Sequence, residues 1–183
     1  MKLHESIDGR LREFIDAQPM FFVATAPSGT DGHVNLSPKG GAGTLVVLDP
    51  LRVAYLDYTG SGAETIAHLR DNGRITLMWC AFSGPPNIVR VHGVGRAVLP
   101  DDPDFAGLLA AFDGPEHKGL RSIIEVTARR VSDSCGYQVP LMEHVGDRDL
   151  LTRWAGRKSD AELDEYRAKK NARSIDGLPA LTG

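Results

Sequence analysis

Six or seven short apolar segments, most of them joined by tight turns, constrain the fold of this chain more than any other feature of its sequence. The stretches 27–32 and 83–86 are rich in Pro, Gly and Ser and are typical of hairpin connections. A single short helix predicted between strands, at 63–72, is too isolated for the strand–helix alternation of a doubly wound sheet. We therefore expect a mainly β protein with flanking helices, folded as an antiparallel, Greek-key barrel. The strand candidates are 21–26, 33–37, 44–48, 53–57, 74–82, 88–99 and 122–131.

Helical patterns flank these strands. Apolar residues recur at helical spacing from Leu3 to Ile15 and predict an opening helix that ends before Pro19. Further helices are predicted at 104–112, 149–158 and 160–172. A length of 183 residues suits one domain with its own core, so we expect one unit over 1–183. Its barrel spans about 14–131, and a helical C-terminal extension spans 149–172.

Charge and cysteine content exclude several classes of function. The formal net charge is −3, so no basic surface predicts nucleic acid or an anionic membrane as a partner. The two cysteines form neither a disulfide framework nor a zinc motif, and no metal site is predicted. Because no apolar run reaches membrane-spanning length and the first residues lack the apolar segment of a signal peptide, we expect a cytoplasmic protein.

Two polar stretches interrupt the strand candidates, at 34–41 and 58–65. The second follows the apolar strand 53–57 and leads into the short helix. A helix N-terminus carries partial positive charge and unsatisfied N–H groups, so small residues there suit a phosphate. Two plainer interpretations stay open: Ser61 and Thr65 are typical helix caps, and Lys39 is typical of a solvated loop.

The strand 75–82 is apolar on both of its alternating faces. One face can fill the barrel, and the other needs a cover because a bare apolar patch is unfavourable in water. A second copy of the chain is the simplest cover, which predicts a homodimer. The alternative cover is the chain's own C-terminal helices.

The order of these motifs resembles the pyridoxamine 5′-phosphate oxidase-related family of FMN-binding split β-barrels. The resemblance covers roughly 14–131 and is strongest at 34–39, at 55–61 and along 89–93. The stretch 170–179 also resembles endings of uncharacterised members. Membership implies FMN held at a homodimer interface and two-electron chemistry on a small-molecule substrate. The flavin ring carries that chemistry, so no catalytic side chain is singled out.

The resemblance also implies a set of cofactor-binding residues. Asn35, Ser37 and Lys39 would line the ribityl and pyrimidine side, and Lys39 or a backbone N–H beside it would stabilise negative charge on the reduced ring. Tyr58, Thr59 and Ser61 would meet the phosphate, with Thr65 adding a hydroxyl. Asn87 and Arg90 lie on the segment that approaches the flavin in the family.

Two departures from the family pattern narrow the function. Gly62 and Ala63 stand where pyridoxamine phosphate oxidases carry a basic pair for the FMN phosphate, and Arg90, Arg96 and Arg173 are candidate replacements. The C-terminal signature that clamps the vitamin substrate is missing. We therefore predict an FMN-dependent oxidoreductase that is not a true pyridoxamine phosphate oxidase. Alternatives are a deazaflavin F420-dependent reductase of the same fold, a non-catalytic flavin- or haem-binding protein, and a dimeric interaction domain without a cofactor.

Overall fold

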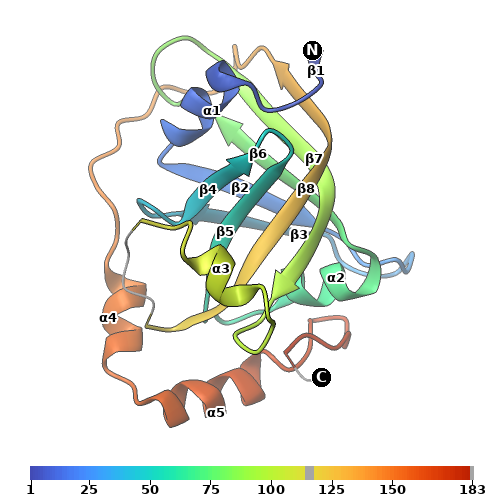
Figure 1. The fold of residues 1–183 in the computed structure, drawn as a ribbon, viewed down its shortest axis with the longest axis vertical. Helices are drawn as coiled ribbons and strands as arrows, with labels where there is room; N and C mark the ends of the chain where they lie inside the picture. The colour runs from blue at the N-terminus through green and yellow to red at the C-terminus, as the bar shows by residue number, and fades with distance from the viewer. Residues whose placement is uncertain (114–117, 182–183) are drawn as a thin grey trace.

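A computed structural model describes residues 1–113 and 118–181 and contains one antiparallel sheet curled into a half-barrel, with helices around it (Figure 1). The strand order is β3-β2-β6-β7-β8-β5-β4, and β1 pairs with β8 outside this path. The split β-barrel predicted from the sequence is thereby confirmed. The strands are β1 (Lys2–His4), β2 (Met20–Thr25), β3 (Asn35–Gly40), β4 (Leu45–Asp49), β5 (Arg52–Tyr58), β6 (Arg74–Cys80), β7 (Ile88–Val98) and β8 (Leu120–Ser134).

The helices lie at the ends and edges of this sheet. They are α1 (Gly9–Asp16), α2 (Glu64–Asn72), α3 (Phe105–Leu109), α4 (Leu150–Gly156) and α5 (Asp160–Lys170). The predicted stop of α2 is confirmed, because Gly73 adopts φ 72° and its N–H donates to the Leu69 carbonyl. Within the described residues, every helix is too short or too polar to cross a lipid bilayer.

The start of the chain differs from the prediction. The described residues form eight strands where six or seven were expected, because residues 2–4 pair with β8 instead of beginning a helix. Helix α1 begins later because Asp8 caps it, its side chain accepting a hydrogen bond from the Leu11 amide at 2.8 Å. Only the C-terminal part of the predicted helix, including the buried Leu11 and Ile15, is therefore helical.

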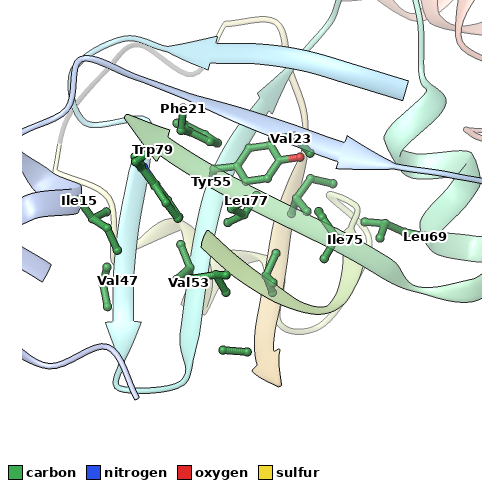
Figure 2. Packing of buried hydrophobic residues seen from close by; sticks show 14 of the residues in the cluster. Ile15, Phe21, Val23, Val47, Val53, Tyr55, Leu69, Ile75, Leu77 and Trp79 are labelled. Carbon is green, nitrogen blue, oxygen red and sulfur yellow. The ribbon is translucent and has the colours of Figure 1, made fainter. Parts of the chain in front are cut away.

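The core fills the inside of the curl (Figure 2). Its centre is aromatic: the ring of Phe21 stacks on Trp79 at 5.9 Å and meets Tyr55 edge-on at 5.4 Å. Strand β6 contributes Leu77 and Trp79 to this core, whereas Met78 on its other face is only half-buried. The partly exposed outer face is the one for which a second copy of the chain is the predicted cover.

The C-terminal part of the chain returns to the barrel. Figure 1 shows the coil after β8 running along one side of the barrel to α4 and α5. Beyond α5, Ala180 is fully buried in the main core, and Leu178 and Leu181 pack against it. The tail is therefore a structural part of the barrel.

Candidate functional site

Strand β3 presents a polar face to the split in the barrel. Asn35, Ser37 and Lys39 alternate inward, while Val34 and Leu36 on the outer side are 73% and 64% exposed. The sequence analysis ended the predicted strand at residue 37 and placed Lys39 in a polar loop, whereas β3 continues through Pro38 to Gly40. Strand β3 is the first in the strand order and so lies at an edge of the sheet, and an edge strand tolerates a proline.

A cavity of about 610 Å³ lies inside this face, and we call it the polar cavity. It is bounded by β3, the end of β5, the loop 59–63 and the start of α2. Six of the nine predicted cofactor-binding residues line it, and the structure thus gathers residues that are up to 30 positions apart. They are Asn35, Ser37, Lys39, Tyr58, Ser61 and Thr65.

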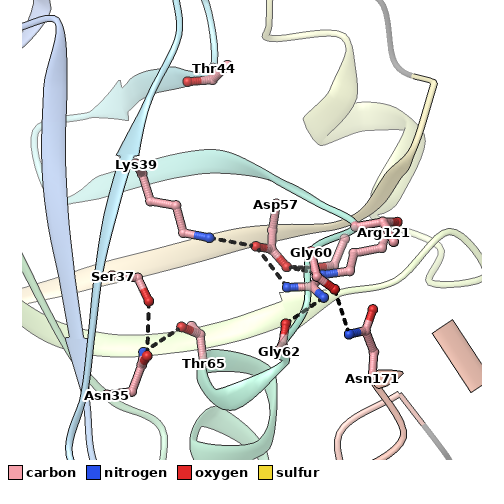
Figure 3. A network of polar contacts seen from close by, with 12 residues as sticks. Asn35, Ser37, Lys39, Thr44, Asp57, Gly60, Gly62, Thr65, Arg121 and Asn171 are labelled. Carbon is pink, nitrogen blue, oxygen red and sulfur yellow. Dashed lines mark hydrogen bonds and ion pairs between the residues drawn. The ribbon is translucent and has the colours of Figure 1, made fainter. Parts of the chain in front are cut away.

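A buried carboxylate organises the cations of the polar cavity (Figure 3). Asp57, whose side chain is 1% exposed, accepts from Lys39 Nζ at 3.0 Å and from Arg121 Nε at 2.8 Å. Burial alone would raise the pKa of Asp57, but Lys39 and Arg121 together lower this pKa to about 2. Lys39 is therefore a positioned, charged group, and the interpretation as a solvated loop lysine is wrong.

Arg121 is the basic residue that the sequence analysis missed. It lines the polar cavity from the start of β8 and also donates to the Gly62 carbonyl at 2.8 Å. The three arginines named as candidate replacements for the basic pair lie outside the lining of this cavity. Arg90 donates to Ser134 Oγ, Arg96 pairs with Glu125 and Asp104, and Arg173 donates to the Gly177 carbonyl.

Asn35 is held by hydrogen bonds on both ends of its amide. Its Nδ2 donates to Thr25 Oγ1 and Thr65 Oγ1, each at 3.2 Å, and its Oδ1 accepts from Ser37 Oγ at 2.9 Å (Figure 3). Thr25 Oγ1 is also 2.9 Å from Nδ1 of the buried His68. The amide orientation is thereby fixed, and Ser37 keeps acceptor capacity toward the cavity.

Within the part of the chain that the structure describes, helix α2 begins without a side-chain cap. Its N-cap is Ala63, for which the described residues provide no side-chain cap hydrogen bond, so neither Ser61 nor Thr65 acts as the predicted cap. The Glu64 carboxylate is tied to the C-terminal tail, accepting from the Ile175 amide at 2.9 Å. The start of α2, which carries partial positive charge, lies at the cavity with Glu64 and Thr65 in its lining.

The C-terminal segment also fixes the loop 59–63. Asn171, which is fully buried, donates to the Gly60 carbonyl at 2.9 Å, and Arg167 Nε donates to Thr59 Oγ1 at 2.9 Å. Thr59 itself is buried and donates to the Gly119 carbonyl, so its hydroxyl supports the loop and does not line the cavity.

Asn87 and Arg90, the remaining predicted residues, lie at the far end of the β6–β7 hairpin. The Asn87 carbonyl accepts from the Ala81 amide, and Arg90 is paired across the sheet with Ser132. Within one chain they are therefore separate from the polar cavity.

Comparison with known proteins identifies the family of the chain. A sequence profile described as pyridoxamine 5′-phosphate oxidase matches residues 7–135. The pyridoxamine 5′-phosphate oxidase family protein UstO of Aspergillus flavus is 39% identical over 192 aligned positions, covering 97% of this chain and 77% of that protein.

Two solved structures show the same fold. HupZ of group A Streptococcus matches with a TM-score of 0.53 and 16% identity, over 70% of this chain and 99% of that one. The conserved hypothetical protein Rv2991 of Mycobacterium tuberculosis matches with a TM-score of 0.51 and 18% identity, over 80% of this chain and 99% of that one. The fold and the sequence agree, and the chain belongs to the pyridoxamine 5′-phosphate oxidase family.

Proposed function

We propose that this protein is an FMN-dependent oxidoreductase that acts on a small molecule and holds its cofactor at a homodimer interface. The observation that carries the proposal is the polar cavity itself, in a member of this family. It brings hydroxyls, an amide, an ammonium and a helix N-terminus to one place. These are groups that hold a ribityl chain and a phosphate.

The residues present fit FMN with a changed balance of charge. Lys39 and Arg121 supply two positive charges at the cavity, Glu64 supplies a negative charge in its lining, and the buried Asp57 supplies another behind the two cations. The phosphate therefore depends on the first N–H groups of α2 and on Ser61, Tyr58 and Thr65. FMN supplies the hydride chemistry when bound. The chain's own part is to fix Lys39 through Asp57, so that an ammonium is ready where negative charge develops.

The outer face of β3 supports the homodimer. Val34 and Leu36 are large apolar side chains left exposed beside the polar cavity. A second chain docked there would cover them.

Deazaflavin F420 is the second candidate cofactor. The specific observation in its favour is the pair Gly62 and Ala63, which leaves the cavity without the extra cations that an FMN phosphate meets in pyridoxamine phosphate oxidases. A mass spectrum of the small molecule released from purified protein on denaturation distinguishes FMN from F420. Release of neither, together with no binding of either when added, would refute the proposal.

Two lysine-to-alanine variants test the role of Lys39. Charge-assisted hydrogen bonds contribute about 1.5–3 kcal/mol, so Lys39→Ala is expected to weaken FMN binding about 10- to 100-fold and to change the flavin's redox potential. Lys169→Ala, at an exposed position of α5, is the matched control and is expected to leave both unchanged. Unaltered affinity and potential in Lys39→Ala would remove Lys39 from the site.

A further inference from the structure

A second and larger cavity, of about 1,140 Å³, lies on the other side of the loop 40–44, and we call it the apolar cavity. Phe21 and Trp79, whose stacked rings are almost fully buried, line its inner end, here called its floor. Residues 135–149, here called the strap, supply Leu141 and Met142 to its outer wall. Concave, mainly apolar spaces of this order are where proteins bind small organic molecules.

The strap is fastened to the barrel on two sides of this cavity. Its Met142 amide donates to the Phe82 carbonyl at 2.9 Å, and the Ala42 amide donates to Asp147 Oδ2 at 3.1 Å. The other carboxylate oxygen, Asp147 Oδ1, is 3.1 Å from His144 Nε2. The wall is therefore built from defined contacts and carries a hydrogen-bonding pair beside apolar surface.

Carboxylates outnumber basic side chains around the apolar cavity, where His144 is the one basic residue among the described lining residues. Asp16, Glu143 and Asp147 line it, and among the described lining residues none is lysine or arginine. Carboxylates around a space with apolar walls repel an anion and attract a cation. A phosphate ester is therefore a poor occupant, whereas an amine or an uncharged ring system is a good one.

We infer that the apolar cavity binds the substrate, and that this substrate is an uncharged or cationic aromatic small molecule. This inference rests on the proposed function, since only a redox role makes the occupant a substrate. Gly40 and Thr44 line both cavities, so a molecule in the apolar cavity is adjacent to a cofactor in the polar one. A small molecule is the occupant because the aromatic floor is recessed and the hydrogen-bonding pair lies in the wall.

Three naphthalene probes of the same size and different charge test the inference on the full-length protein, with and without added FMN. They are naphthalen-2-ylmethylamine, a cation at neutral pH, the uncharged 2-naphthol, and the anion naphthalene-2-sulfonate. Isothermal titration calorimetry is expected to give saturable binding of about one amine or naphthol per chain, and at least tenfold weaker binding of the sulfonate. Sulfonate binding as tight as that of the amine, or no saturable binding of any probe, overturns the inference.

Two strap variants locate the binding. Met142→Lys places a cation in the cavity wall, whereas Val145→Lys places the same charge on a side chain that is 94% exposed and outside the lining. Met142→Lys is expected to weaken binding of the amine at least tenfold and to reduce the difference in affinity between the amine and the sulfonate. Val145→Lys is expected to change the affinity for either probe by no more than twofold. Equal effects of both variants, or dissociation of a dimer by Met142→Lys without a change in probe binding, overturn the inference.

The outcome is separable from that of the proposed function. FMN is expected to bind Met142→Lys as it binds the parent protein, because Met142 does not line the polar cavity. Probe binding without any flavin binding would refute the proposed function and leave a ligand site of the stated charge preference. Flavin binding without probe binding would overturn the inference about the substrate and leave the proposed function standing.

Discussion

The two cavities of this protein meet at Gly40 and Thr44 but are built in opposite ways. The polar cavity is held by barrel strands and by a buried ion network centred on Asp57. The apolar cavity has a rigid aromatic floor, but its outer wall is a coil fastened by a few exposed hydrogen bonds. The difference teaches that one site is fixed by the fold, whereas the other is bounded by a segment that can vary without disturbing the barrel.

The strongest test of this contrast is Asp57→Asn. Removing the charge leaves Lys39 and Arg121 without their buried partner, and breaking such a network typically costs 3–5 kcal/mol of unfolding free energy. Urea denaturation measures this loss. The matched control is Asp149→Asn, at an exposed ion pair with Arg153, which is expected to cost less than about 0.5 kcal/mol. A loss below about 1 kcal/mol in Asp57→Asn would show that the network does not hold the polar cavity.

The pH dependence of stability is a second test of the ion network around Asp57. The pKa of Asp57 is about 2 in the folded protein and about 3.9 in an unfolded chain, so its stabilising effect is complete above about pH 5 and is lost progressively as the pH falls toward about 1. The size of this loss is about 2.6 kcal/mol. The pH dependence of unfolding free energy between pH 4 and 2 is therefore expected to be shallower in Asp57→Asn than in the parent protein. Equal slopes would contradict the assignment.

A smaller effect is expected from single hydroxyls. Ser37→Ala removes the hydrogen bond that fixes the Asn35 amide and is expected to cost about 1 kcal/mol of unfolding free energy. Ser83→Ala changes an exposed serine that lines the apolar cavity and is expected to cost less than about 0.5 kcal/mol. Thermal unfolding of the two variants compares the cavities directly. A larger loss in Ser83→Ala would reverse the comparison.

The smallest effect on stability is expected from Asp147→Asn. Its ion pair with His144 is exposed and contributes about 0.2–1 kcal/mol. Its consequence is local: amide hydrogen exchange is expected to rise at Ala42 and in the strap, and to stay unchanged along β3. Faster exchange along β3 as well would mean that the two cavities are not independently held.

The elements around the polar cavity were largely predictable from sequence, because local patterns specify them. Strand β5 is a short apolar run, and helix α2 ends at a glycine in the left-handed region. Six of the nine predicted residues came together because alternation along β3 and the turn before α2 are local properties. The extent of β3 was missed because Pro38 suggests a loop until the strand is known to lie at an edge.

The partners of the site residues were not predictable, because they come from distant parts of the chain. Arg121 is 64 positions from Asp57, and the two meet only through the antiparallel register of β5 and β8. In the sequence, Arg96 was also a candidate for binding the phosphate, yet the register of β7 and β8 places it opposite Glu125. A strand pattern shows which face a residue occupies but not which residue faces it.

The hydrogen bond from Asn171 to the Gly60 carbonyl has a consequence for biosynthesis. The two residues are 111 positions apart, so at roughly 5–20 residues per second the ribosome delivers Asn171 about 5–20 seconds after the loop that it secures. During that interval the nascent barrel lacks the segment that completes its core around Ala180. The loop 59–63 is thus secured only after the tail has been translated.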